Sequence, residues 1–235
     1  MSASTADTAV ADTVDLIDDD ARDRLVVRGS DAATYLQSQL SQTVADLTVG
    51  SARWSFVLEP NGKVAVLARV TRTADDEFVL DTDAGFGEAM QSRVTRFMIR
   101  VDVTTELQLA SAAAPSDDHE RRRVAAGWPR MGAEIHDGQT IPATTGVVPL
   151  AVNFTKGCYP GQELVERMDS RGADAPRRPV VVDAAGRSVG DSVVVDDADV
   201  GSITSVSPDG DLAIASVKRG VDVGRPPAHL ADVED

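Results

Sequence analysis

The sequence predicts an α+β fold that ends in a small all-β module. In the first hundred residues, apolar runs with strand and helix periodicity follow the order strand, helix, hairpin, strand, helix, strand. A doubly wound parallel sheet would need a helix between every pair of strands, so we expect mixed or antiparallel sheets covered by helices. From Pro179 onward, short β-branched runs alternate with Gly, Asp and Pro, which is typical of a compact β-barrel.

Strands are predicted at 23–29 and 77–82, where β-branched and apolar residues dominate. Two apolar-alternating runs within 53–70 flank Pro60-Asn61-Gly62, the turn chemistry of a hairpin. The segments "IRVDV" (99–103) and "ELQLA" (106–110) also read as strands. The second helix is expected at 85–98, with several large apolar residues near one face.

The first helix is predicted over 30–40. Ala33, Leu36 and Leu40 would form its buried stripe, and Ser30 is placed to cap its N-terminus. We therefore expect three parts in the chain: an acidic flexible arm at 1–20, an α+β core at 21–173 and the β module at 174–235. The arm carries six aspartates and no basic residue.

Charge is the dominant global feature. The 235 residues include 38 acidic and 23 basic side chains, for a net charge of −15, and only three lysines. Acidic residues are spread along the whole chain, which favours adaptation to a halophilic cytosol over a surface for one basic partner. Strong nucleic-acid binding is not expected, because phosphate contacts need clustered cations.

One cysteine, no long apolar run and no signal-peptide pattern indicate a cytoplasmic protein without a membrane segment. The three histidines have no metal-ligand spacing, so no metal site is expected. A monomer is the default expectation for the chain.

The segment "TKGCYPGQELVERM" (155–168) holds the single cysteine, Cys158, two residues after one of the lysines, Lys156. Pro160 suits the first turn of a helix, so Cys158 would precede a helix N-terminus. The helix dipole and the Lys156 charge would both favour a thiolate. The alternative is a buried, unreactive cysteine in a tight turn, which the residues alone favour about two to one, because free cysteines are mostly buried.

Residues 156–163, the signature segment, resemble the K-G-C-[YF]-x-G-Q-E motif of the YgfZ-type folate-binding proteins, relatives of the glycine-cleavage T-protein (aminomethyltransferase). Weaker similarities support the match in the same order. They are "GSDAATYLQSQLSQTV" (29–44), "LEPNGKVAVLARV" (58–70), "GWPRMGAEI" (127–135) and "DVGSITSVS" (199–207).

This resemblance implies T-protein-like subdomains around a central channel that takes tetrahydrofolate or a one-carbon derivative, closed by a small C-terminal β-barrel. It implies a folate-binding accessory protein that supports the assembly or repair of iron–sulfur enzymes, including tRNA-modifying ones. Its expected partners are folate and those enzymes or their assembly factors. The alternative is an aminomethyltransferase-type enzyme that transfers a one-carbon unit to tetrahydrofolate.

By the same resemblance, Cys158 and Lys156 are the expected catalytic residues. Tyr159, Gln162 and Glu163 are expected to bind folate, together with Trp128, for which core packing is the alternative. The sequence also departs from the T-protein pattern. The stretch 123–127 has alanine, Ala126, in place of a pterin-binding glutamate, which argues against aminomethyl transfer.

Overall fold

The computed structural model describes residues 16–170 and 175–230 and consists of two antiparallel sheets joined by helices. The first part contains η2 (Asp19–Ala21), β1 (Arg22–Arg28), α2 (Ala32–Gln39), β2 (Ala52–Leu58), β3 (Val64–Ala74), β4 (Glu77–Asp83), α3 (Gly87–Thr95), β5 (Thr104–Gln108) and α4 (Asp117–Ala126). The second contains η3 (Pro142–Thr144), α5 (Val148–Ala151), α6 (Gln162–Ser170), β6 (Arg177–Asp183), β7 (Ser192–Val195), β8 (Ala198–Val206), β9 (Leu212–Lys218) and η4 (Ala228–Leu230).

The first sheet has the strand order β2-β3-β4-β1-β5, and every neighbouring pair is antiparallel. Helix α3 lies across this sheet in contact with all five strands, while α5 packs on β2. The large core side chains Trp54, Phe56 and Phe78 are fully buried here. The α+β class and the antiparallel sheet expected from the sequence are thus confirmed.

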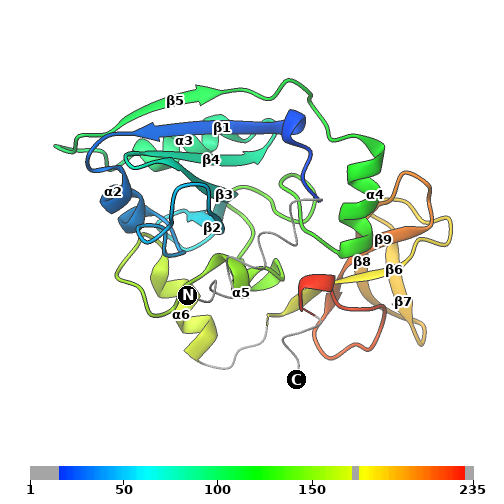
Figure 1. Cartoon of the computed structure of the whole chain (residues 1–235). Coiled ribbons are helices and arrows are strands. Elements are labelled where there is room, and N and C mark those ends of the chain that lie inside the picture. Colours follow the sequence, from blue (N-terminus) through cyan, green and yellow to red (C-terminus); the bar gives the residue numbers. More distant parts are fainter. Residues whose placement is uncertain (1–15, 171–174, 231–235) are drawn as a thin grey trace.

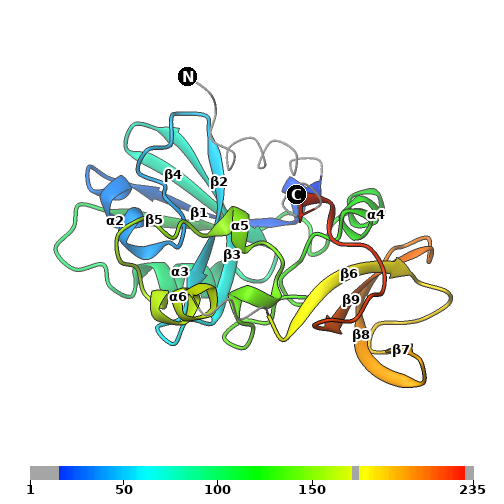
Figure 2. The same ribbon diagram turned by 90° about the horizontal axis from the view of Figure 1, so that it is seen from below.

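The C-terminal unit is a four-stranded antiparallel sheet of order β6-β9-β8-β7, with a small core of its own. The described strands do not close into a barrel, because β6 and β7 form the two edges and β6 gains only a single bridge, from Val181 to Arg225. Figure 1 shows the two sheets at opposite ends of the molecule with α4 between them, and Figure 2 shows α5 and α6 beside the first sheet. The expected central channel stays a prediction.

Buried polar side chains fasten the two units together at α4. Arg123 donates to Glu134 Oε2 at 3.1 Å and to Ser205 Oγ, on β8, at 2.8 Å. Glu134 Oε1 accepts from the hydroxyls of Ser205 and Thr204, both at 2.7 Å. These charge-assisted bonds hold β8 against the segment that follows α4.

Two local expectations were wrong. The stretch 99–103 is not a strand, because Arg100 adopts a left-handed backbone conformation (φ 54°) that breaks the extended run. Ser30 does not cap α2; Asp31 occupies the N-cap position, and the Ser30 hydroxyl donates to Asp102 at 2.8 Å. An acidic flexible arm was expected at 1–20, and residues 1–15 of it lie outside the described part of the chain. In the described remainder, Ile17 is buried.

Candidate functional site

The signature segment forms a turn that leads into α6 and packs against the β2–β3 hairpin turn. Gly161 has φ 84°, and a Cβ there would lie 2.6 Å from the carbonyl oxygen of Glu59. Gly62, in the hairpin turn, would bring a Cβ to 2.3 Å from Leu164 Cβ. Only glycine fits at these two positions, so the two turns interlock through their backbones.

Lys156 fastens the same turn to the C-terminal end of α2. Its Nζ donates to the carbonyl oxygens of Gln37 at 2.6 Å and of Leu40, and it lies 5.0 Å from the centre of the Tyr159 ring. Burial lowers the pKa of Lys156 to about 8. The ammonium group binds the C-terminal end of α2, where the helix dipole favours a cation. Its hydrogen bonds go to backbone carbonyls rather than to the thiol.

Tyr159 is a core residue in this structure. Its side chain is buried, and desolvation raises its pKa to about 12, with a smaller contribution from Glu166. The Lys156 ammonium lies over the face of this ring, an arrangement that cation–π attraction favours. The expected contact between Tyr159 and folate stays a prediction, and the ring's present role is to anchor the turn.

Gln162 and Glu163 begin α6. The Gln162 side chain accepts from the Tyr159 N–H at 3.3 Å and donates to Glu166, one helical turn further on. Glu163 is exposed at the first turn, where the helix dipole favours a carboxylate. Gln162 thus braces the turn, while Glu163 is free to meet a ligand from solvent.

Cys158 is exposed at this turn. The residues on either side of it are held, Lys156 by the end of α2 and Tyr159 by the core. The thiol is therefore accessible from solvent on a turn that the protein holds in place. The thiol is exposed, so the alternative of a buried cysteine does not describe this structure, and the reactivity of Cys158 stays a prediction.

An apolar pocket of about 280 Å³ lies beside α6. Phe154, just before the signature segment, and Val165 and Met168, on α6, contribute to its walls, and η3, α5 and Leu230 supply the rest. Figure 1 shows α5 and α6 close together below the first sheet. Its walls carry no ionisable side chain, so the pocket suits the apolar face of a ring.

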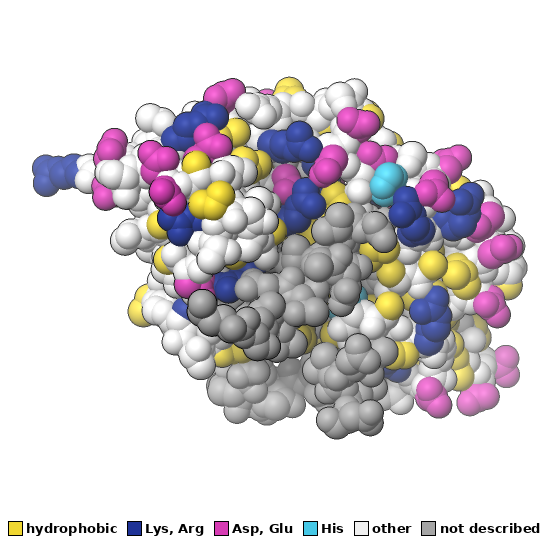
Figure 3. All heavy atoms as spheres, viewed as in Figure 1, with side chains coloured by type: hydrophobic (Ala, Val, Ile, Leu, Met, Phe, Trp, Pro, Cys, Tyr) yellow, Lys and Arg dark blue, Asp and Glu magenta, His cyan; other side chains and the backbone are white. Residues whose placement is uncertain are grey.

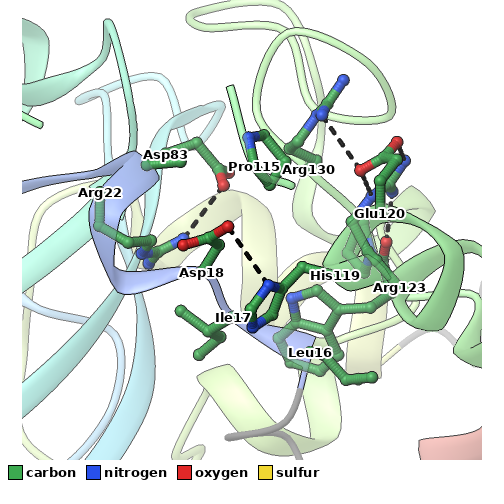
Figure 4. A pocket seen from close by; sticks show the side chains of 13 residues that line it. Leu16, Ile17, Asp18, Arg22, Asp83, Pro115, His119, Glu120, Arg123 and Arg130 are labelled. Carbon is green, nitrogen blue, oxygen red and sulfur yellow. Dashed lines mark hydrogen bonds and ion pairs between the residues drawn. The ribbon is translucent and has the colours of Figure 1, made fainter. Parts of the chain in front are cut away.

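Trp128 belongs to a different pocket. It is buried, its ring centre lies 4.8 Å from that of Trp54, and it meets His229 edge to face at 5.1 Å. Figure 4 shows the pocket that it lines, which we call the tryptophan pocket. The other lining residues are Leu16, Ile17, Asp18, Ala21, Arg22, Asp83, Pro115, His119, Glu120, Arg123, Pro129 and Arg130.

Charged groups of the tryptophan pocket pair with one another. Arg22 donates to Asp83 at 3.1 Å, while Glu120 accepts from Arg123 at 2.7 Å and from Arg130 at 3.2 Å (Figure 4). Burial opposes the charge on Arg123, yet its carboxylate partners raise the pKa of this guanidinium. Sequence reasoning missed this site because its residues come from segments far apart in the chain.

The arginine run 121–123 is divided between two environments. Arg121 pairs with Asp209 at 2.7 Å, and Arg122 pairs with Asp118 at 2.7 Å, both at the surface, whereas Arg123 is buried. Acidic side chains are scattered over the face seen in Figure 3, with Arg and Lys between them. No helix among the described residues is both long and apolar enough to cross a membrane.

Comparison with known proteins relates the chain to one superfamily. The family model of the GCVT N-terminal domain matches residues 3–113. An uncharacterized protein of Haemophilus influenzae is 27% identical, over 63% of this chain and 66% of its own length. The tRNA-modifying protein YgfZ of Shigella boydii is also 27% identical, over 63% of this chain and 65% of its own. The chain thus spans slightly less than two thirds of these relatives.

The fold agrees with that relationship. The crystal structure of the glycine cleavage system aminomethyltransferase T of Bartonella henselae superposes with a TM-score of 0.71, covering 86% of this chain and 77% of that one, at 15% identity. At this identity the match concerns the fold alone. Family model, relatives and fold together bear out the resemblance seen in the signature segment: the chain is similar to the YgfZ-type proteins of the glycine-cleavage T-protein superfamily.

Proposed function

We propose that the protein binds a folate and supports the assembly or repair of iron–sulfur enzymes, including enzymes that modify tRNA, with Cys158 as its reacting group. The observation that carries this proposal is the exposed thiol of Cys158 on a turn whose flanking residues are fixed. The YgfZ relatives are called tRNA-modifying proteins, which supports the tRNA-linked part of the role.

The residues around the signature segment fit part of a folate. The apolar pocket of about 280 Å³ beside α6 is large enough for a bicyclic ring, although its walls offer no carboxylate to the polar edge of a pterin. Glu163 and the backbone of the turn are the nearest groups along the chain that would supply hydrogen bonds. A bound folate would bring a one-carbon carrier to this site.

The contacts of the other signature residues support the roles that we propose for them. Lys156 and Tyr159 position the turn, because both are engaged with the protein itself. Gln162 braces the entry to α6. Cys158 and Glu163 remain available to ligands. A reactive thiol at this position suits sulfur transfer, acceptance of a one-carbon group or transient contact with iron.

Two experiments test the proposal. Calorimetric titration with tetrahydrofolate in high salt is expected to give saturable heat, and the ligand should raise the melting temperature. In the native host lacking this gene, the wild-type chain should restore iron–sulfur enzyme activities, whereas Cys158→Ser should not. Full rescue by a folded Cys158→Ser protein would show that the thiol is not needed for the function. Absence of any heat on titration would show that the protein does not bind tetrahydrofolate.

A further inference from the structure

A cleft of about 520 Å³ lies where the two units meet, and we call it the interunit cleft. One wall comes from the segment 133–144, and the other is the C-terminal sheet, through β6, β8 and β9. The cleft shares no lining residue with the apolar pocket beside α6 or with the tryptophan pocket. Its volume is in the range of small-molecule sites, so it is a separate place where a ligand would fit.

Hydrogen bonds hold the two walls of the interunit cleft in fixed positions. From one wall to the other, Glu134 Oε1 accepts from the hydroxyls of Thr204 and Ser205, both at 2.7 Å. The turn 136–140 is fixed to β3 by two backbone hydrogen bonds of 2.8 Å with Val64. A ligand would therefore enter a preformed site and would not have to order its walls.

The sheet presents a polar face to the cleft and keeps its apolar core on the opposite face. Ser216, on β9, is the register partner of Ser202 on β8 and of Pro179 on β6, so these three side chains lie in one row. Arg177 precedes Pro179 by two residues and lines the cleft at the end of this row. The next residue along β6 from Pro179, Val180, belongs to the core of the unit. The hydroxyls of the row thus face the cleft and not the core.

The polar groups of this face are available to a ligand. Among the described residues, the side chains of Ser202 and Ser216 make no hydrogen bond. Arg177 donates to the Ser216 carbonyl at 3.1 Å, and no carboxylate of a described residue lies within ion-pair distance of its guanidinium. Glu134, which also lines the cleft, is ion-paired with an arginine of α4 at 3.1 Å. The cleft therefore offers hydroxyl groups to a polar body and a cation to an anionic group.

We propose that the interunit cleft binds a phosphorylated sugar, either free or as part of a mononucleotide. The sugar hydroxyls exchange hydrogen bonds with Ser202, Ser216 and, on the facing wall, with Gln139. The phosphate pairs with Arg177, whose planar guanidinium can bond two phosphate oxygens at once. A sugar without phosphate leaves the guanidinium without an anion, and inorganic phosphate leaves the hydroxyls to water. Tight binding therefore needs both halves of the ligand.

Calorimetric titration of the wild-type chain at constant ionic strength tests the proposal, with ribose 5-phosphate as the probe. Ribose and inorganic phosphate are titrated separately as its two halves. We expect ribose 5-phosphate to give saturable heat and to bind at least tenfold more tightly than either half. AMP is titrated in parallel, because tighter binding of AMP would identify a mononucleotide as the ligand, and equal or weaker binding would identify a free sugar phosphate.

Two substitutions locate the binding site. Arg177→Gln removes the cation and should weaken the binding of ribose 5-phosphate at least tenfold, because a charge-assisted hydrogen bond is lost. Arg178→Gln is the matched control, which should change the affinity less than twofold. Arg178 is the next residue of β6, donates to the Val221 carbonyl at 3.0 Å and does not line the cleft. Ser216→Val places a β-branched apolar side chain in the row and should abolish the heat.

The proposal would be overturned by equal affinity of wild type for ribose 5-phosphate and inorganic phosphate, by absence of saturable heat, or by unchanged binding in Arg177→Gln. Arg177 is exposed, so this variant should keep the native near-ultraviolet circular dichroism. If Ser216→Val does not fold, Arg177→Gln decides alone. Neither folate nor the thiol enters the test, and Cys158→Ser should bind the probe as wild type does, so the outcome is independent of the proposed function.

Discussion

The signature segment and the tryptophan pocket use polar groups in opposite ways. At the signature segment the sulfur atom of Cys158 is exposed, and the backbone around it is held by glycine contacts and by Lys156. In the tryptophan pocket the charged groups are themselves enclosed and neutralise one another. A substitution of the reactive side chain should thus cost function at the first site, while loss of a charge should cost stability at the second.

The largest effect is expected where a buried charge loses its partner. Arg123→Ala would leave Glu120 and Glu134 without their main counter-ion, in side chains that are 15% and 6% exposed. We expect a loss of about 3–5 kcal/mol in the free energy of unfolding, measured by urea titration at fixed salt. Arg122→Ala, one residue earlier and paired with Asp118 at the surface, is the control and should change stability by less than about 1 kcal/mol. Similar losses for both would show that the buried network is not important.

The next effect distinguishes the two glycines of the signature segment. Gly161→Ala places a methyl group 2.6 Å from the Glu59 carbonyl at a positive φ, so it should destabilise the fold by about 2–4 kcal/mol. A Cβ at Gly157 would meet nothing within 4 Å, and Gly157→Ala should be close to neutral. Urea titrations of both variants test the interlocked turns. Equal stability of the two variants would rule out the packing of Gly161 on the hairpin turn.

Lys156→Met should cost about 1–3 kcal/mol, because it removes a charged donor from the carbonyls of Gln37 and Leu40. The effect should depend on pH. The folded-state pKa of Lys156 is about 8, below the value of about 10.4 for an exposed lysine. Between these values the unfolded chain binds more protons, so the Lys156 contribution to stability rises with pH.

The unfolding midpoints of wild type and Lys156→Met should accordingly diverge from pH 7 to pH 9.5, with wild type gaining. This range stays below the titration of Tyr159, whose pKa is about 12. A difference that is constant over this range would mean that burial does not perturb the lysine.

The smallest effect on stability is expected for Cys158→Ser. An exposed thiol makes little contribution to packing, so the free energy of unfolding should change by no more than about 0.5 kcal/mol. The same variant is expected to abolish function, which is the sharpest form of the contrast between the two sites. A loss above about 2 kcal/mol would place the sulfur in the core instead.

Local sequence patterns were enough for most of the fold and for the signature helix. The hairpin 53–70 and the helix after Pro160 follow from periodicity and turn chemistry, and β2, β3 and α6 occupy those places. The hydrogen bonds of Lys156 could not be predicted from local sequence patterns. Cys158 lies only two residues away in the sequence, but the hydrogen-bond partners of Lys156 lie 116 and 119 residues away, at the end of α2.

The same limit applies to the tryptophan pocket and to the C-terminal sheet. Arg22, Asp83 and Glu120 meet only because β1, β4 and α4 converge, and no local motif records that. The runs after Pro179 do form strands, but their spacing does not determine whether the edge strands β6 and β7 pair to close a barrel, and in this structure they do not. Long-range pairing is a property of the whole fold rather than of any window of sequence.

The most direct test of the account is the rate at which iodoacetamide alkylates Cys158 in the native protein, with and without saturating 5-formyltetrahydrofolate. As the single cysteine of the chain, it gives an unambiguous signal by mass spectrometry. We predict one modified thiol per native chain, at a rate within about tenfold of the unfolded chain, and several-fold slower reaction when folate is bound. Alkylation that requires unfolding, or a rate unaffected by bound folate, would contradict the claim that this turn presents its sulfur at the folate site.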